Sequence, residues 1–192
     1  MKNKNFFYIT LFAVEFSLLL AAFFVVFFKK IPFYSLFASL SPLYLQSITG
    51  LLTGAAAAAL ITYLVVKLPV FSEIRGIIVS LIKNFNLKVY DLVLIAVLSG
   101  VCEETLFRGV IQPVLGIWLT SFIFIFLHGY FNPFSAKITL FGIIMFFISS
   151  AMGGLYKHLG LFSAVSFHFS YNLTALFIMW FHIKKQPPDN PQ

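Results

Sequence analysis

Long apolar stretches separated by short polar ones dominate the pattern of this chain. No Asp, Glu, Lys or Arg occurs in residues 31–66, 92–102 or 138–156. A membrane-spanning helix needs roughly 20 predominantly apolar residues. The pattern therefore predicts an all-α fold, a polytopic membrane helix bundle of about six transmembrane helices. These helices are expected at residues 6–28, 44–66, 89–115, 117–130, 138–157 and 161–183.

An amphipathic pattern follows the second predicted span. Residues 67–88 carry charged side chains, and apolar residues recur among them at the spacing of one helical face. This combination predicts an interfacial amphipathic helix between the second and third spans. The apolar face consists of Ile74, Ile77, Ile78 and Leu81.

The composition narrows the class of protein. Of 192 residues, 60% are hydrophobic and 10% are charged, whereas about a quarter of the residues in soluble domains are charged. These values exclude a soluble domain, a disordered chain and a nucleic-acid-binding module, although the net charge is +7. The single cysteine, Cys102, excludes an intrachain disulfide framework and a multi-cysteine zinc site.

Membrane topology explains the positive charge. With the N-terminus inside, the inner loops and ends hold nine of the 13 basic residues, the outer loops hold three, and Arg108 lies within a span. Cytoplasmic loops are enriched in Lys and Arg. The asymmetry therefore predicts a multi-pass protein of the cell membrane with both termini in the cytoplasm.

Glu103 and Glu104 stand side by side in an otherwise apolar stretch. A charged group inside a span is costly unless it is paired or reaches a wet cavity, so such residues are functional candidates. Arg108 lies four residues after Glu104, on the same helix face, and can pair with it. That pair alone is more typical of structural support than of chemistry. Glu103 points about 100° away and lacks this partner.

Three more polar residues interrupt later spans, namely His128, His168 and Asn172. The four-residue spacing puts His168 and Asn172 on one helix face. A single buried histidine is more often a helix–helix hydrogen-bond partner than a catalyst. Together with Glu103, however, these side chains supply a base, an orienting group and donors for a developing oxyanion, which water activation requires.

Three other ionisable residues have weaker claims to function. Glu15 is alone in the first predicted span, where it either faces a wet cavity or is protonated. His158 and His182 lie at the ends of spans. The three clusters around Glu103, His128 and His168 are therefore the favoured site.

The three clusters resemble the motifs of the CPBP family (CAAX protease and bacteriocin-processing, or Abi) of glutamate intramembrane proteases, in its prokaryotic form. E-E-x-x-x-R is found at residues 103–108, F-x-x-x-H at 124–128 and H-x-x-x-N at 168–172. Each motif alone is weak, but all three in order on successive apolar helices are specific. The resemblance covers residues 89–176.

The resemblance implies roles for seven residues. Glu103 would be the general base that activates a water, and His128 would help to hold that water. His168 and Asn172 would stabilise the tetrahedral oxyanion. The residues that would support the site are Glu104, Arg108 and Phe124.

On this resemblance the chain is expected to form one integral membrane domain, residues 1–192. Its parts are two N-terminal spans with the interfacial helix at 1–87, the catalytic core at 88–183 and a polar tail at 184–192. The implied activity is cleavage of a peptide bond in a membrane-associated peptide or protein, in bacteriocin processing or self-immunity. The expected partners are that substrate and the lipid bilayer, without nucleic acid.

Two other chemistries stay open within catalysis. Cys102 can act as a thiolate nucleophile with His128 or His168 as its base. Glu103 and the two histidines also resemble a two-histidine, one-carboxylate metal set. Activation of water by a glutamate needs no metal, so the expectation is no required cofactor, with a divalent metal as the alternative.

Two non-catalytic functions also stay open. One is a membrane protein that binds a peptide without cleaving it, such as an immunity protein. The nearly isosteric substitution Glu103→Gln distinguishes this function, because it should abolish only catalysis. The other is a transporter, which is disfavoured because the two halves show no inverted repeat.

Overall fold

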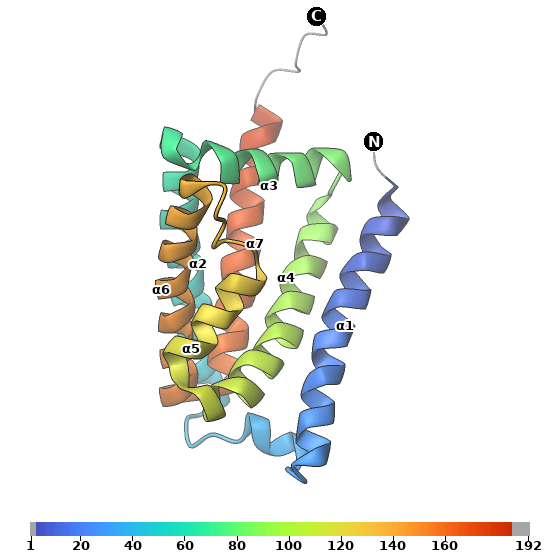
Figure 1. Cartoon of the computed structure of the whole chain (residues 1–192), viewed down its shortest axis with the longest axis vertical. Coiled ribbons are helices and arrows are strands. Elements are labelled where there is room, and N and C mark those ends of the chain that lie inside the picture. The colour runs from blue at the N-terminus through green and yellow to red at the C-terminus, as the bar shows by residue number, and fades with distance from the viewer. Residues whose placement is uncertain (1–2, 186–192) are drawn as a thin grey trace, which may run out of the picture.

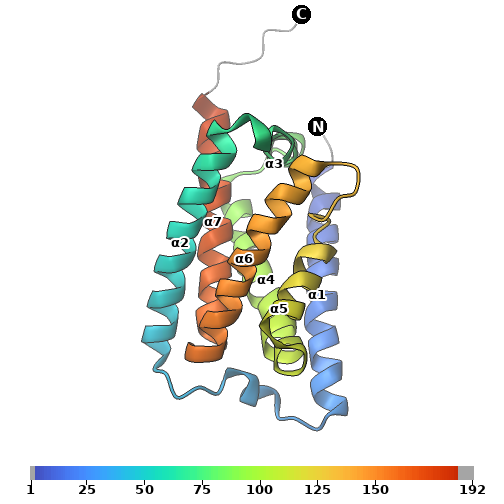
Figure 2. The same cartoon turned by 60° about the vertical axis from the view of Figure 1, so that its left-hand side comes forward.

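The computed structural model describes residues 3–185, which contain helices and no strand. The long helices form one bundle, and their arrangement is seen in Figure 1 and, from a second side, in Figure 2. This architecture confirms the predicted all-α membrane helix bundle. The elements are α1 (Lys4–Phe28), the 3-10 helix η1 (Phe33–Phe37), α2 (Leu43–Lys67), the 3-10 helix η2 (Pro69–Phe71), α3 (Ser72–Asn84), α4 (Val89–Glu104), the π-helix η3 (Thr105–Ile111), α5 (Gln112–Leu127), α6 (Ala136–Leu159) and α7 (Leu161–Lys185).

Five segments among the described residues are long and apolar enough to cross a bilayer. Four of them follow the single helices α1, α2, α6 and α7. The fifth is the 39-residue segment Val89–Leu127, which joins α4, η3 and α5. It bends at Gly116, whose backbone has φ 75° and ψ 174°. The spans predicted at 89–115 and 117–130 are therefore two limbs of one bent segment.

The second limb is too short to cross the membrane. Residues 117–127 rise about 17 Å as a helix, whereas the hydrocarbon core is about 30 Å thick. In Figure 1, α5 climbs from one end of the bundle and stops part-way, and the chain then continues to the start of α6 at the other end. His128 is the C-cap of this half-span, so the bend places its imidazole, which is 33% exposed, at the border of the cavity in the bundle.

Helix α3 lies across one end of the bundle (Figure 1). Ile74 and Ile82 are buried, and Ile78 and Leu81 line a cavity beneath the helix. The predicted amphipathic helix is thus confirmed, with its apolar side on the bundle. The start of α1 and the end of α7 lie at this same end. That both termini are cytoplasmic stays a prediction.

Helix α7 is the centre of the bundle and packs most closely against α2. Gly50 and Gly54 of α2 face the α7 backbone, where a side chain would meet the carbonyl oxygens of Ser163 and Phe167. Small residues allow such close approach between membrane helices. This packing holds α7, and with it the third motif, against the rest of the bundle.

Candidate active site

The first motif lies where α4 becomes the π-helix η3. Glu104 and Arg108 are both fully buried, and Arg108 Nε donates to Glu104 Oε2 at 3.0 Å. The other oxygen, Glu104 Oε1, accepts from His168 Nδ1 of α7 at 2.8 Å. Glu104 therefore bridges the first and third motifs, and the pairing predicted from the four-residue spacing is present.

Arg108 is held by residues beyond its own motif. Its Nη2 donates to Ser149 Oγ at 2.6 Å and to the Ser149 carbonyl oxygen at 3.3 Å. Its guanidinium also lies 5.4 Å from the centre of the Phe124 ring. Phe124 packs edge-on against Phe107 and His168. Phe124 thus joins the half-span α5 to the buried ion pair.

Glu103 has a different environment from its neighbour. It is 8% exposed, and its Oε2 has no hydrogen-bond partner. The nearest basic group is His128 Nε2, at 3.6 Å from Glu103 Oε2. This distance exceeds a hydrogen bond, and polar atoms so spaced are commonly bridged by a water. Glu103 is thus available for chemistry, whereas Glu104 is fully engaged.

The hydrogen bond made by His128 Nδ1 determines whether the other ring nitrogen, Nε2, is a donor or an acceptor toward Glu103. His128 Nδ1 lies 2.7 Å from the carbonyl oxygen of Phe124. Because a carbonyl only accepts, we assign the ring proton to Nδ1. In the neutral ring, Nε2 is then an acceptor directed at the Glu103 carboxylate. Two acceptors then lie 3.6 Å apart, and a water beside them can satisfy both.

The third motif lines a cavity inside the bundle. His168 and Asn172 border a space of about 310 Å³ together with His128 and apolar side chains from α2, α3, α4, α6 and α7. His168 Nε2 is left for this space because Nδ1 is bound to Glu104. Asn172 Nδ2 donates to Ser99 Oγ at 2.9 Å, which leaves one further amide hydrogen.

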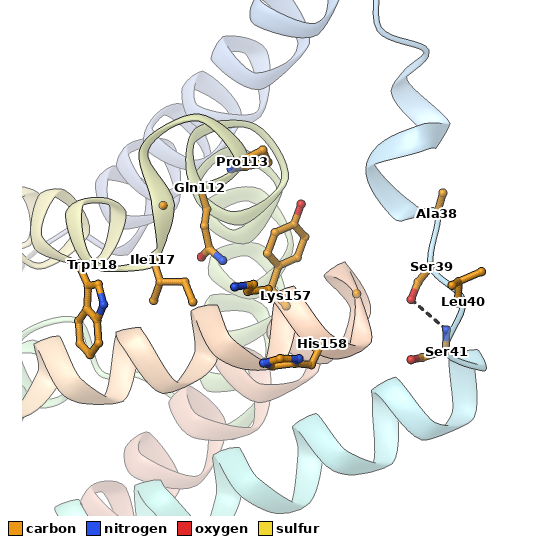
Figure 3. Close-up of a pocket in the computed structure, with 13 residues that line it drawn as sticks. Ala38, Ser39, Leu40, Ser41, Gln112, Pro113, Ile117, Trp118, Lys157 and His158 are labelled. Carbon is orange, nitrogen blue, oxygen red and sulfur yellow. Dashed lines mark hydrogen bonds between the residues drawn. The ribbon is translucent and has the colours of Figure 1, made fainter.

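Three other candidate residues from the sequence, His158, His182 and Cys102, do not line the inner cavity. His158 borders a second cavity of about 730 Å³ at the end away from α3, beside Ser39 and Lys157 (Figure 3). His182 lies in the last turn of α7 and is not among the residues that line the inner cavity. Cys102 is buried and forms no disulfide within the described residues.

Within residues 3–185, no three or more His, Cys, Asp and Glu side chains are grouped so that they could hold a metal ion. Glu103, His128 and His168 thus lie in one region without forming a ready set of ligands. The dependence of the protein on a metal stays open to experiment.

Sequence reasoning missed two polar supports of the site. Ser149 holds Arg108, and Ser99 holds Asn172. Both are serines inside apolar spans, where a hydroxyl can also bond its own helix and so leaves no distinct pattern. The pair Ser149–Ser150 in the middle of a span was the available signal, but spacing alone could not connect it to Arg108.

The fold and the exposed side chains together show which class of protein this is. Large apolar side chains such as Phe24, Trp118 and Leu127 are exposed along the five spans, as lipid-facing residues are, and a charged cluster is buried among them. This is a multi-pass membrane protein with an intramembrane polar site.

Comparison with models of known protein families gave a match to part of the chain. Residues 84–174 match the family model described as "Type II CAAX prenyl endopeptidase Rce1-like", and the matched range contains all three motifs. These 91 of the 192 residues are similar to that family, in agreement with the CAAX-protease resemblance of the three motifs. Comparison with curated proteins and with solved structures gave no match.

Proposed function

We propose that this protein is an intramembrane endopeptidase in which Glu103 activates the attacking water. The observation that carries the proposal is the 3.6 Å gap between Glu103 Oε2 and His128 Nε2. A water beside this pair can hydrogen-bond to both atoms and present its oxygen to the cavity that His128 borders. The family supplies the reaction class, and the buried unpaired carboxylate supplies the base.

In the proposed reaction, Glu103 takes a proton from the water as the water oxygen attacks the scissile carbonyl carbon. The resulting tetrahedral oxyanion accepts hydrogen bonds from His168 Nε2 and Asn172 Nδ2. When the carbon–nitrogen bond breaks, Glu103 returns its proton to the leaving amine. The products are a carboxylic acid and an amine, and the carboxylate of Glu103 is regenerated.

The charge balance of the buried groups supports the donor role of His168. Glu103 and Glu104 carry two negative charges, and Arg108 carries one positive charge. An imidazolium at His168, bonded to Glu104 through Nδ1, makes this set neutral, which an apolar interior favours. In that state Nε2 carries the hydrogen that an oxyanion needs.

The shape of the site indicates the kind of substrate. Its cavity of about 310 Å³ is bordered largely by Ile, Phe and Met side chains, and the protein lies in the bilayer. We infer that the substrate is a membrane-associated peptide or protein that presents an apolar segment to the cavity. Bacteriocin processing and self-immunity are settings in which such cleavage would act.

The test is turnover of a peptide library by the purified protein in lipid nanodiscs. Glu103→Gln should lose cleavage, whereas Cys102→Ser, one residue away, should keep it, with or without a chelator. Loss in Cys102→Ser would indicate a thiol nucleophile, and loss with chelator a metal. Binding of peptide without cleavage in the wild type would overturn the protease proposal in favour of a peptide-binding protein.

A further inference from the structure

A second unpaired carboxylate lies outside the matched region, on α1. Glu15 is 5% exposed, and its Oε2 is buried without a hydrogen-bond partner. Helix α1 packs against α4 and η3, the elements that carry the first motif. A buried polar atom without a partner is costly, so the position of this carboxyl needs an explanation.

The register between α1 and α4 places Glu15 at the level of the first motif. The two helices run in the same direction (Figure 1). They are fixed at their starts because Asp91 Oδ2 accepts from Lys4 Nζ at 2.7 Å. Glu15 lies as many residues after Lys4 as Cys102 lies after Asp91, and equal helical rise brings the two to one depth.

The charges around Glu15 agree with this register. Glu15 interacts electrostatically with Cys102 and Glu103 of α4 and with His168 of α7. The other charged groups of the site are engaged elsewhere, because Glu104 and Arg108 pair with each other. Glu15 and Glu103 are thus two buried carboxyls on the packed helices α1 and α4, and each has an Oε2 atom without a hydrogen-bond partner.

Two such carboxylates cannot both be ionised at low cost, so a pair in this setting retains one proton. Of the two, Glu103 has the more stabilising surroundings for a negative charge. His128 and His168 favour a negative charge on Glu103 and Glu104 opposes it, and His128 Nε2 is 3.6 Å from Glu103 Oε2. Among the described groups, only His168 acts favourably on Glu15. The proton is therefore held at lower cost on Glu15.

We propose that Glu15 is a second carboxyl of this site, which carries the one proton that Glu15 and Glu103 retain between them. Its neutral acid leaves Glu103 ionised and adds an O–H donor beside it. The consequence for turnover rests on the proposed function: Glu15 is then a positioning residue that keeps Glu103 in its basic form. Its own proton is not consumed in the reaction.

The protonation can be measured without a substrate, by infrared spectroscopy of the protein in lipid nanodiscs at neutral pH. The chain has only six Asp and Glu residues, so the carbonyl band of a protonated carboxylic acid can be assigned. Wild type should show this band and Glu15→Gln should lose it. The exposed carboxyl variant Glu73→Gln should leave the band unchanged.

The infrared measurement tests the assignment of the proton to Glu15 even if one of the variants does not fold. No acid band in the wild type, or a band that persists in Glu15→Gln, overturns the assignment. If Glu15→Gln does not fold, Glu15→Asp takes its place, and a band that this variant leaves unmoved overturns the assignment. These outcomes do not depend on whether the protein cleaves peptides, so they are separable from failure of the proposed function.

Turnover adds an independent comparison once cleavage is established. Glu15→Gln mimics the neutral acid and should stay within about threefold of the wild-type rate, whereas Glu15→Leu, which lacks the donor, should lose about tenfold or more. Leu18→Ala, on the same face of α1, controls for loosened packing. Equal losses in Glu15→Gln and Glu15→Leu would overturn the positioning role.

Discussion

The two ends of α4 carry buried carboxylates in contrasting surroundings. At its first turn, Asp91 accepts hydrogen bonds from Lys4 Nζ at 2.7 Å, from the Tyr8 hydroxyl and from the backbone N–H of Lys88 at 2.6 Å. At its last turn, Glu103 keeps an oxygen without a partner. Pairing offsets the cost of burying a charge. The comparison indicates that Asp91 holds helices together, whereas Glu103 is kept free for chemistry.

Glu104 sharpens this contrast because it is the sequence neighbour of Glu103. Each of its oxygens has a partner, Arg108 on one side and His168 on the other. The helical rotation between consecutive residues is enough to give one carboxylate a complete set of partners and the other none. Substitutions that remove paired groups should therefore affect folding, and removal of Glu103 should not.

The largest expected effect on stability is that of Arg108→Leu. This change leaves Glu104 buried with only His168 beside it, so we expect the free energy of unfolding to fall by about 3–5 kcal/mol. Unfolding in mixed detergent micelles would measure it. Lys29→Leu, which removes an exposed positive charge, is the control. A variant as stable as wild type would show that the pair at the last turn of α4 is not structural.

Asp91→Asn should have a smaller effect. It weakens a charge-assisted contact with Lys4, whose side chain is 27% exposed and can be rehydrated. We expect a loss of about 1–2 kcal/mol in the free energy of unfolding. Cleavage per folded molecule should stay within about threefold of wild type. A large loss of rate at unchanged stability would contradict the structural role of Asp91.

Ser149→Ala should cost about 1 kcal/mol, since Arg108 keeps its bond to the Ser149 carbonyl oxygen after the hydroxyl is removed. The adjacent Ser150→Ala is a matched control because the Ser150 hydroxyl bonds only within its own helix, to Phe146. Equal stability of the two variants would indicate that the hydroxyl of Ser149 does not hold the guanidinium. Chemical unfolding of both proteins side by side would distinguish these cases.

The smallest effect on stability is expected for Glu103→Gln. Because Glu103 has no ion-pair partner within hydrogen-bond distance, the free energy of unfolding should change by no more than about 0.5 kcal/mol. Peptide cleavage should nevertheless fall by about 10²–10⁴-fold. Measuring both quantities on one preparation separates the two. A marked loss of stability would contradict the contrast between the two ends of α4.

Much of the site could be predicted from the sequence because its residues are charged or polar in apolar spans. The Glu104–Arg108 pair followed from spacing on one helix. The hydrogen bond between Glu104 and His168 joins residues 64 positions apart, and no local pattern encodes such a contact. The supports Ser149 and Ser99 were missed for the same reason.

The spans show a similar division. Hydropathy located the apolar segments but treated residues 117–130 as a separate span. Gly116, with its positive φ, instead bends one continuous segment so that α5 ends inside the bundle. Hydropathy reports the cost of exposing residues to water. It does not predict where a helix bends or in which direction.

The sequence by itself determined that this is a multi-pass helical membrane protein and which motifs carry its polar residues, because both depend on local composition and helical spacing. Only the tertiary structure decided which partners the carboxylates receive from other helices. Pairing depends on contacts between helices, as when α1 brings Glu15 to the level of Glu103 and α7 brings His168 to Glu104. The same residue type thus has different chemistry at neighbouring positions because the surrounding helices supply different partners.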